Sequence, residues 1–321
     1  MTRPVWIGIL FIASLGSVAA GLLLGSVRLP AAEVWAALAG NAAAPTHDIV
    51  WLLRLPRVAS AFGCGALLAT AGVLLQVLLR NPLADPYVLG VSGGSAVASL
   101  SAFLLGASWA TASLAALAGA GVVTALVFVL SYRGAGWNME RLLLTGVVLS
   151  SGFAAIISLL LVIAPSGEVR GMLFWLMGDL ANADQPVIPW LLLLVMLPLS
   201  IALGRHLDIL LLGEVKAESL GVPVSQVQVV IYVSAAVAAA GVVATAGSIG
   251  FVGLLVPHLV RLLGIHLHRA LLPCAALLGG SFLTFADMLA RTVAAPTQLP
   301  VGAITALIGV PALLALLVRQ P

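Results

Sequence analysis

The residues of this 321-residue chain that could do chemistry are few, and most stand at the ends of long apolar runs. An enzyme acting inside a membrane needs a nucleophile paired with a base, or a set of metal ligands. Neither arrangement is present in the sequence, and neither is a Walker A motif or a cofactor fingerprint. We therefore predict that the chain is not an enzyme, binds no cofactor or metal of its own, and does not hydrolyse ATP alone.

The first charged cluster flanks one apolar run. Arg54 and Arg57 precede the run, and the stretch Arg80–Pro86 follows it. Its two prolines, four residues apart, force a sharp non-helical turn. Asn81 and Asp85 can fold that turn through side-chain hydrogen bonds. On spacing alone, the pattern favours a structural hairpin at the membrane surface.

A second charged segment covers residues 210–223. Gly213 and Gly221 are placed to end a short helix on either side. The helix combines charged residues with leucines, namely Glu214, Lys216 and Glu218 with Leu210, Leu211, Leu212 and Leu220. A short amphipathic helix either lies on a membrane or seats in a groove of a partner protein. Acidic residues outnumber the single lysine, which favours a protein partner.

The histidines and cysteines have ordinary interpretations. His258, alone in an apolar run, is expected to pack with a hydrogen bond rather than to act as a ligand or relay. His266 and His268 are expected to be solvated turn residues. Cys64 and Cys274 have small apolar neighbours, so we expect small hydrophobic packing residues, with a disulfide or metal site as the weaker alternative.

The elements that must position these residues are predicted to be transmembrane helices. Hydrophobic residues make up 62% of the chain, charged residues only 8%, and mean hydropathy is +1.20, which indicates that lipid is the main solvent. Ten apolar runs are expected to form an all-α, polytopic transmembrane bundle of about ten spans. The runs are Val5–Ser26, Val58–Leu79, Tyr87–Leu105, Trp109–Tyr132, Leu142–Ala164, Val187–Leu203, Val224–Ala246, Phe251–Leu263, Leu271–Leu289 and Val301–Val318.

The basic residues predict the orientation. With ten spans, nine of the 14 Lys and Arg residues fall on the side of the termini, so the positive-inside rule places both termini in the cytoplasm. The first run is long for a signal peptide and is expected to be a retained helix. No linker is evident, so residues 1–321 are expected to form one transmembrane domain. The scattered basic residues argue against nucleic-acid binding.

Six sequence blocks together resemble the FecCD-type (type II) permease family of ABC importers for iron–siderophores, haem and cobalamin. The resemblance covers nearly the whole chain, in order and with compatible spacing. The blocks are Arg54–Arg57 (RLPR), Arg80–Pro86 (RNPLADP), Leu89–Gly94 (LGVSGG), Gly213–Gly221 (GEVKAESLG), Gly247–His258 (GSIGFVGLLVPH) and Leu299–Thr305 (LPVGAIT).

The resemblance implies a permease homodimer in the inner (plasma) membrane, two ABC ATPase subunits that use the ATP, and a periplasmic binding protein. It implies ATPase coupling through the cytoplasmic loop 205–223, at Leu212, Gly213, Glu214, Ala217, Leu220 and Gly221. It implies a cytoplasmic gate at Asn81 and Leu83, and binding-protein docking at Arg54, Arg57 and Arg291. Asp287 is expected to hold Arg291 by an ion pair. The family has a second gate region before the fifth apolar run, where the cobalamin branch has small hydroxyl residues. The stretch Asn138–Arg141 differs from those residues.

Several alternatives stay open at this point. The three arginines could instead anchor helix ends at lipid headgroups. Met172, Met177, Phe174 and Trp175 could line a pathway mouth or sit in an aromatic belt. An ion-gradient-driven secondary transporter is the alternative function, although such proteins usually place ion-coordinating residues at the midplane. The sequence does not separate siderophore, haem and cobalamin as substrates.

Overall fold

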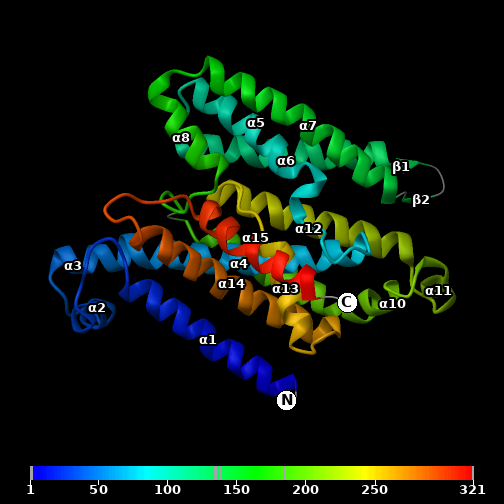
Figure 1. Ribbon diagram of the computed structural model, residues 1–321, viewed down its shortest axis with the longest axis horizontal. Coiled ribbons are helices and arrows are strands. Elements are labelled where there is room, and N and C mark those ends of the chain that lie inside the picture. Colours follow the sequence, from blue (N-terminus) through cyan, green and yellow to red (C-terminus); the bar gives the residue numbers. More distant parts are fainter. Residues whose placement is uncertain (1–2, 134–135, 138, 184, 320–321) are drawn as a thin grey trace.

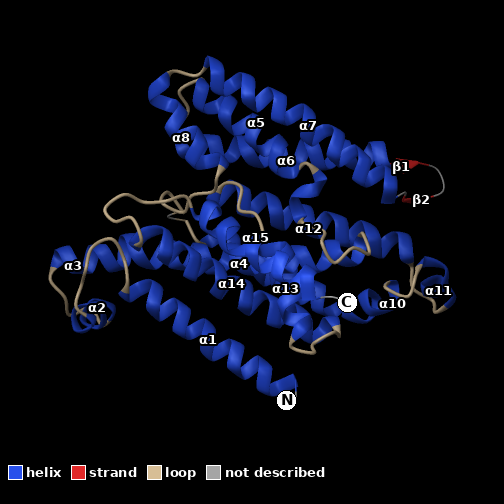
Figure 2. Cartoon of the chain, viewed as in Figure 1, coloured by secondary structure: helices blue, strands red, loops and turns tan. Residues whose placement is uncertain are grey.

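The computed structural model describes residues 3–133, 136–137, 139–183 and 185–319. These residues form an all-α bundle with one short β-hairpin (Figures 1 and 2). The first half contains α1 (Arg3–Leu23), α2 (Ala31–Leu38), α3 (Ala44–Asp48), the π-helical turn η1 (Ile49–Arg54), α4 (Leu55–Leu78), the 3-10 turn η2 (Pro86–Leu89), α5 (Val91–Leu104), α6 (Trp109–Ser131), β1 (Tyr132–Arg133) and β2 (Gly136–Trp137). The second half contains α7 (Met139–Ile163), α8 (Ser166–Leu176), α9 (Val187–Ala202), α10 (Gly204–Leu210), α11 (Glu214–Ser219), α12 (Val224–Ala246), α13 (Val252–Leu262), α14 (His268–Thr292) and α15 (Val301–Arg319).

Each of the ten predicted runs contains a helix, but the helices differ in length. Among the described residues, six continuous helical stretches are long and apolar enough to cross a membrane, and the bent pair α9–α10 makes a seventh. The other three are α5, α13 and α15, whose apolar stretches are only 10–17 residues long. A span ordinarily needs about 20 residues. The chain is therefore a polytopic membrane protein that combines long membrane-spanning helices with three short ones.

Helix α4 is the centre of the bundle and packs against α14, α12, α9 and α13 (Figure 1). Almost all of its residues are buried, and many are Gly or Ala. At Gly72, an added Cβ would lie 2.7 Å from the Cα of Gly253 and nearer still to its carbonyl. At Gly65, it would lie 2.8 Å from the Cβ of Leu283. These glycines let the backbones approach closely, as small residues do in membrane helix packing.

Helices α5, α6, α7 and α8 form a second group beside α12 (Figure 1). Met172 and Trp175 of α8 are buried in its core with Leu100 and Val243. They therefore neither line a pathway mouth nor sit in an aromatic belt, because packing against α5 and α12 takes up both side chains. Met177, in contrast, is exposed.

The connections contain more helix than the sequence suggested. The stretch 28–57, which lies between the first two predicted apolar runs, folds into α2, α3 and η1, and η1 runs directly into α4. The reason is a small apolar core, in which Val34 and Ala37 pack against Val50. The connection 165–186 likewise contains α8, and 204–223 contains α10 and α11.

Two non-helical segments interrupt the helices of the bundle. The turn after α4 is held by Asn81 Oδ1, which accepts from the Leu83 N–H at 2.9 Å, and by Asp85 Oδ1, which accepts from the Tyr87 N–H at 2.8 Å. Both bonds confirm the predicted turn chemistry. At the start of α5, Ser92 Oγ donates to Ser248 Oγ at 2.8 Å, in the break between α12 and α13. Non-helical backbone is tolerated there because protein surrounds it.

Candidate functional site

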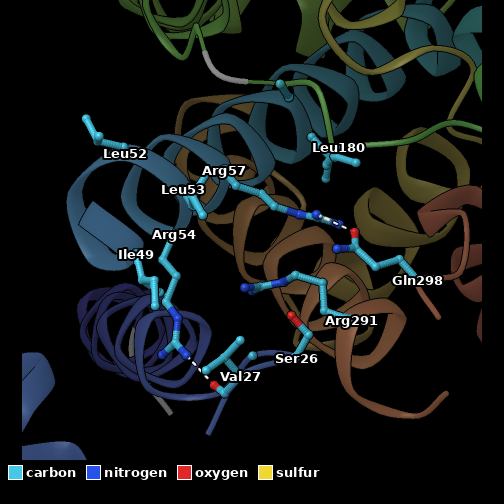
Figure 3. A pocket seen from close by; sticks show the side chains of 13 residues that line it. Ser26, Val27, Ile49, Leu52, Leu53, Arg54, Arg57, Leu180, Arg291 and Gln298 are labelled. Atoms are coloured by element: carbon cyan, nitrogen blue, oxygen red, sulfur yellow. Dashed lines mark hydrogen bonds between the residues drawn. The ribbon is translucent and has the colours of Figure 1, made fainter. Parts of the chain in front are cut away.

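Polar side chains gather at both ends of α4, whose 24 residues span about 36 Å. The first gathering surrounds a cavity of about 220 Å³ that Figure 3 shows from close by. Arg54 and Arg57 reach it from η1 and α4, Arg291 from α14, and Gln298 from the loop before α15. The structure therefore brings together all three arginines that the resemblance assigned to docking.

Arg54 holds the end of α1. Its guanidinium donates to the carbonyl oxygens of Leu22 at 2.6 Å, Leu23 at 3.0 Å and Val27 at 2.6 Å. The last carbonyls of a helix have no partner within the helix, and a cation at this end also complements the helix dipole. Arg54 thus fastens α1 to the start of α4.

Arg57 and Arg291 share one carboxylate. Arg57 Nε and Nη2 donate to Asp287 Oδ1 at 3.0 and 2.8 Å, and Arg57 Nη1 donates to Gln298 Oε1 at 2.7 Å. Arg291 Nε lies 3.0 Å from Asp287 Oδ2, which confirms the expected ion pair four residues apart in α14. Bidentate arginine–carboxylate pairs of this kind are strong and fix side-chain orientation.

These charged groups are almost completely enclosed within the single chain. Arg54 is 4% exposed, Arg57 8% and Arg291 4%. Asp179, in the loop after α8, lies near the Arg57–Asp287 pair and is also buried. Burial raises the pKa of the Asp179 carboxyl, and the hydrogen bond from the Ala181 N–H opposes that rise. Three guanidinium groups against two carboxyls leave an excess of positive charge around the cavity.

Sequence reasoning missed two members of this cluster. Gln298 and Asp179 were not singled out, because each stands alone in a connection and no local spacing links it to the arginines. Their role becomes visible only when α4, α8 and α14 are packed together. Whether the arginines dock a binding protein stays a prediction.

The second gathering lies at the other end of α4, around α11 (Figure 1). Gly213 and Gly221 flank α11 with φ values of +105° and +78°, which confirms that glycines bound this helix. An L-residue at either position would be strained. One expectation was wrong: Leu210 is the last residue of α10 and is buried, so it is not part of the apolar face of α11.

Helix α11 presents apolar side chains outward. Leu212 is 58% exposed, Val215 78% and Leu220 61%, while Ala217 is fully buried against the bundle. Ala217 therefore seats α11 on the bundle, and the flanking apolar residues are left for a partner. Val215 was not among the residues expected to couple to an ATPase, since the resemblance leaves its position unspecified.

Glu214 connects α11 to neighbouring elements. Its Oε1 lies 2.9 Å from Arg80 Nη2 and accepts from Gln228 Nε2 of α12 at 3.1 Å. Arg80 directly precedes Asn81, and both Asn81 and Leu83 are exposed. The expected gate residues and the expected coupling residues thus lie next to each other. Asn138, which differs from the gate residues of the cobalamin branch, lies outside the described residues.

The histidines differ from their expected roles. His268 is buried rather than solvated, because its Nδ1 lies 2.6 Å from Asp208 Oδ1 and its backbone N–H also donates to that oxygen at 3.1 Å. Asp208 therefore caps the start of α14. His258 Nε2 is buried with no partner among the described residues, so the expected hydrogen bond is absent at that atom. His266 is exposed, as expected, and Cys64 and Cys274 are buried and free.

An all-α polytopic bundle with a basic cavity at one end and an exposed apolar helix at the other has the architecture of a membrane permease. The model of the FecCD transport family matches residues 9–319. The chain belongs to this family.

Three similar proteins illustrate the relationship. The chain is 36% identical over 336 residues to YvrB of Bacillus subtilis (strain 168), an uncharacterized ABC transporter permease, covering 98% of this chain and 93% of that protein. It is 37% identical over 306 residues to the vitamin B12 import system permease BtuC of Escherichia coli O127:H6, covering 93% and 92%. A solved inward-facing ABC transporter, described as a candidate of the metal-chelate type, matches with a TM-score of 0.86 and 31% identity, covering 100% of both chains.

These comparisons fix the class of activity. The chain is a permease subunit of an ABC importer, and it transports without being an ATPase itself. In such importers ATP is hydrolysed by a partner subunit. The ion-driven transporter considered from the sequence is therefore set aside.

Proposed function

We propose that this permease carries a metal chelate or corrinoid, an iron–siderophore, haem or cobalamin, into the cytoplasm through the inner membrane. The observation that carries this proposal is the contrast between the two ends of α4. One end encloses an excess of positive charge, and the other exposes an apolar helix. The named relatives support this substrate class, because one imports vitamin B12 and one is described as a candidate of the metal-chelate type.

The α11 end is the proposed docking site for the ATPase. Three large apolar side chains lie exposed around a six-residue helix. Exposed apolar groups that cluster on a short protruding helix are typical of a segment that seats in a groove on a partner. Because Ala217 holds α11 against the bundle, a movement of the ATPase would pass directly into the permease.

The sidedness follows from charge. Helix α1 begins and α15 ends on the α11 side of the bundle (Figure 1). The larger share of basic residues counted from the sequence falls on that side, which supports a cytoplasmic location for the α11 end, the loop 205–223 and both termini.

The arginine cavity is the proposed docking site for the periplasmic binding protein. An acidic side chain of the binding protein would meet the excess positive charge of Arg54, Arg57 and Arg291. Complementary charges of this kind steer encounter and fix register more than they add affinity. The existing hydrogen bonds to Asp287 and to α1 hold the guanidiniums in place before docking.

A second copy of the permease is proposed to pack against α7. Along α7 only a few side chains are buried, and its exposed residues are largely apolar. Most soluble and membrane oligomers use two-fold symmetry, in which the same patch serves both copies. Cross-linking through Val148→Cys in α7 should join two copies, whereas Val122→Cys in α6 should not. Equal cross-linking at both sites would favour general lipid-mediated proximity.

The decisive experiment is uptake into liposomes that contain the permease and its ATPase, with the binding protein added outside. ATP enclosed in the vesicles should drive import, and import should stop when the ATPase is omitted. The substrate is assigned by thermal shift of the binding protein with a siderophore, haem and cobalamin in parallel. Import that continues without any ATPase would overturn the proposal.

A further inference from the structure

Arg80 adopts a backbone conformation that an arginine rarely adopts. Its φ is +47°, in the left-handed region, directly after the end of α4. The Arg80 N–H donates to the Val77 carbonyl at 3.2 Å and the Asn81 N–H to the Gln76 carbonyl at 3.1 Å, which is how a helix ends in a Schellman-type turn. Glycine is the favoured residue at that position. An arginine there indicates that its side chain has a use that outweighs the backbone strain.

That use is visible in its contact with α11. Arg80 Nη2 lies 2.9 Å from Glu214 Oε1, and Glu214 is the first residue of α11. The same oxygen accepts from Gln228 Nε2, and Gln228 is buried in α12. A buried amide thus fixes the carboxylate where the guanidinium can reach it.

Fold stability does not explain the pair. The Arg80 and Glu214 side chains are 41% and 42% exposed. Ion pairs as exposed as this contribute little to stability, because water screens them and two flexible side chains must be ordered. The strained backbone of Arg80 lowers the stability of the fold rather than raising it.

The neighbouring contacts show which part of the chain is free to follow α11. One turn before Arg80, Gln76 accepts from Arg261 of α13, and Gln76 Nε2 donates to the Leu254 carbonyl at 3.3 Å. These bonds fasten the end of α4 to α13. The segment beyond them, which begins at Arg80 and includes Asn81 and Leu83, is fastened to α11 instead.

We propose that the Arg80–Glu214 pair is a latch that transmits movement of α11 to the turn carrying Asn81 and Leu83. This rests on the proposed function, in which α11 receives the motion of the ATPase. Arg80 and Glu214 are positioning residues, since they act on the transport pathway through the turn and not by touching substrate. Without the latch, α11 moves but the turn does not follow, so ATP is hydrolysed without import.

The test uses the complete importer in liposomes, with ATP hydrolysis and substrate uptake measured on the same vesicles. Arg80→Gln and Glu214→Gln should each lower the uptake per ATP hydrolysed by about fivefold or more, the lower range of coupling between sites. The reversed pair, Arg80→Glu with Glu214→Arg, should recover much of that ratio. Arg269→Gln, which removes an exposed arginine on the same side of the bundle, should leave the ratio unchanged.

A further variant separates coupling from folding. Arg80→Gly removes the side chain and relieves the backbone, so it should fold at least as stably as the wild type and still lose uptake per ATP. Co-purification of the ATPase with each variant is measured in parallel. If Arg80→Gly and Glu214→Gln retain the ATPase and keep the wild-type ratio, the latch is wrong. If the wild-type permease never binds an ATPase through α11, the proposed function fails instead.

Discussion

The two ends of α4 use charge in opposite ways. At the arginine end, Arg57, Arg291 and Asp287 are buried and joined by several short hydrogen bonds. At the α11 end, Arg80 and Glu214 are half-exposed and share a single short contact. A buried cluster with every group satisfied is rigid, because breaking one member leaves another charge unpaired. An exposed pair can open at little cost.

The contrast suggests that the two ends of α4 have different mechanical roles. Under the proposed function, the arginine end would preserve a fixed shape for a partner that arrives and leaves, while the α11 end would have to move with its partner. Elements that move in a mechanism are drawn from regions of low local stability. The four predictions below test this contrast, from the largest expected effect to the smallest.

The same chemical change at both ends should have very different effects. Asp287→Asn removes the carboxylate that the buried Arg57 and Arg291 share, so we expect a loss of about 3–5 kcal/mol in the free energy of unfolding. Glu214→Gln removes a half-exposed carboxylate and should cost about 1 kcal/mol or less. Thermal unfolding of both variants in one detergent measures the difference. Equal shifts would show that the arginine cluster is not a rigid unit.

Helix α4, which joins the two ends, should not tolerate an added methyl group at Gly72. Gly72→Ala would place its Cβ against the Gly253 backbone, and the expected cost is about 1–3 kcal/mol. Gly121→Ala in α6 is the control, because no atom lies within 4 Å of its added Cβ. This control should be neutral or gain about 0.5–1 kcal/mol of helix stability. Similar losses in both variants would contradict the close approach of α4 and α13.

A charge on α11 should affect assembly without affecting the fold. Val215→Asp places a carboxylate on the most exposed apolar residue of the helix, so we expect about tenfold weaker binding of the ATPase and no change in melting temperature. Val187→Asp, at the start of α9 on the arginine side, is the matched control. Binding measured by surface plasmon resonance on detergent-solubilised permease distinguishes them. Wild-type affinity in Val215→Asp would move the docking site away from α11.

Much of the fold was predictable because membrane spans depend on the length of apolar runs. All ten predicted runs contain a helix, and the Asn81 and Asp85 turn bonds follow from side chains that act on their own backbone. Likewise, the Asp287–Arg291 pair was predicted, since four residues in a helix bring side chains together. These features are local, so the sequence contains all that they need.

The rest depends on contacts between distant residues. Arg57 and Asp287 are 230 positions apart, and only the packing of α4 on α14 joins them. His268 was expected in solvent because its partner Asp208 is 60 positions away, and no residue near His268 in the sequence indicates that contact. The small core under α2 was missed because three apolar residues spread over two short helices do not form a periodic run. In each case tertiary packing decides what the local pattern leaves open.

The smallest expected effect concerns acid and the arginine end. Burial raises the pKa of Asp179 above its unfolded value, so the folded state holds the proton more tightly between the two pKa values. Stability then falls as pH rises through that window and recovers as pH falls. As the pH falls from about 8 to about 4, close to the unfolded pKa of an aspartate, the wild type should gain stability relative to Asp179→Asn, which cannot titrate. Asp48→Asn, at an exposed carboxyl outside the cavity, should not reproduce this difference. Parallel melting curves for wild type and Asp179→Asn at both pH values would mean that Asp179 stays ionised throughout and adds its full negative charge to the arginine cavity.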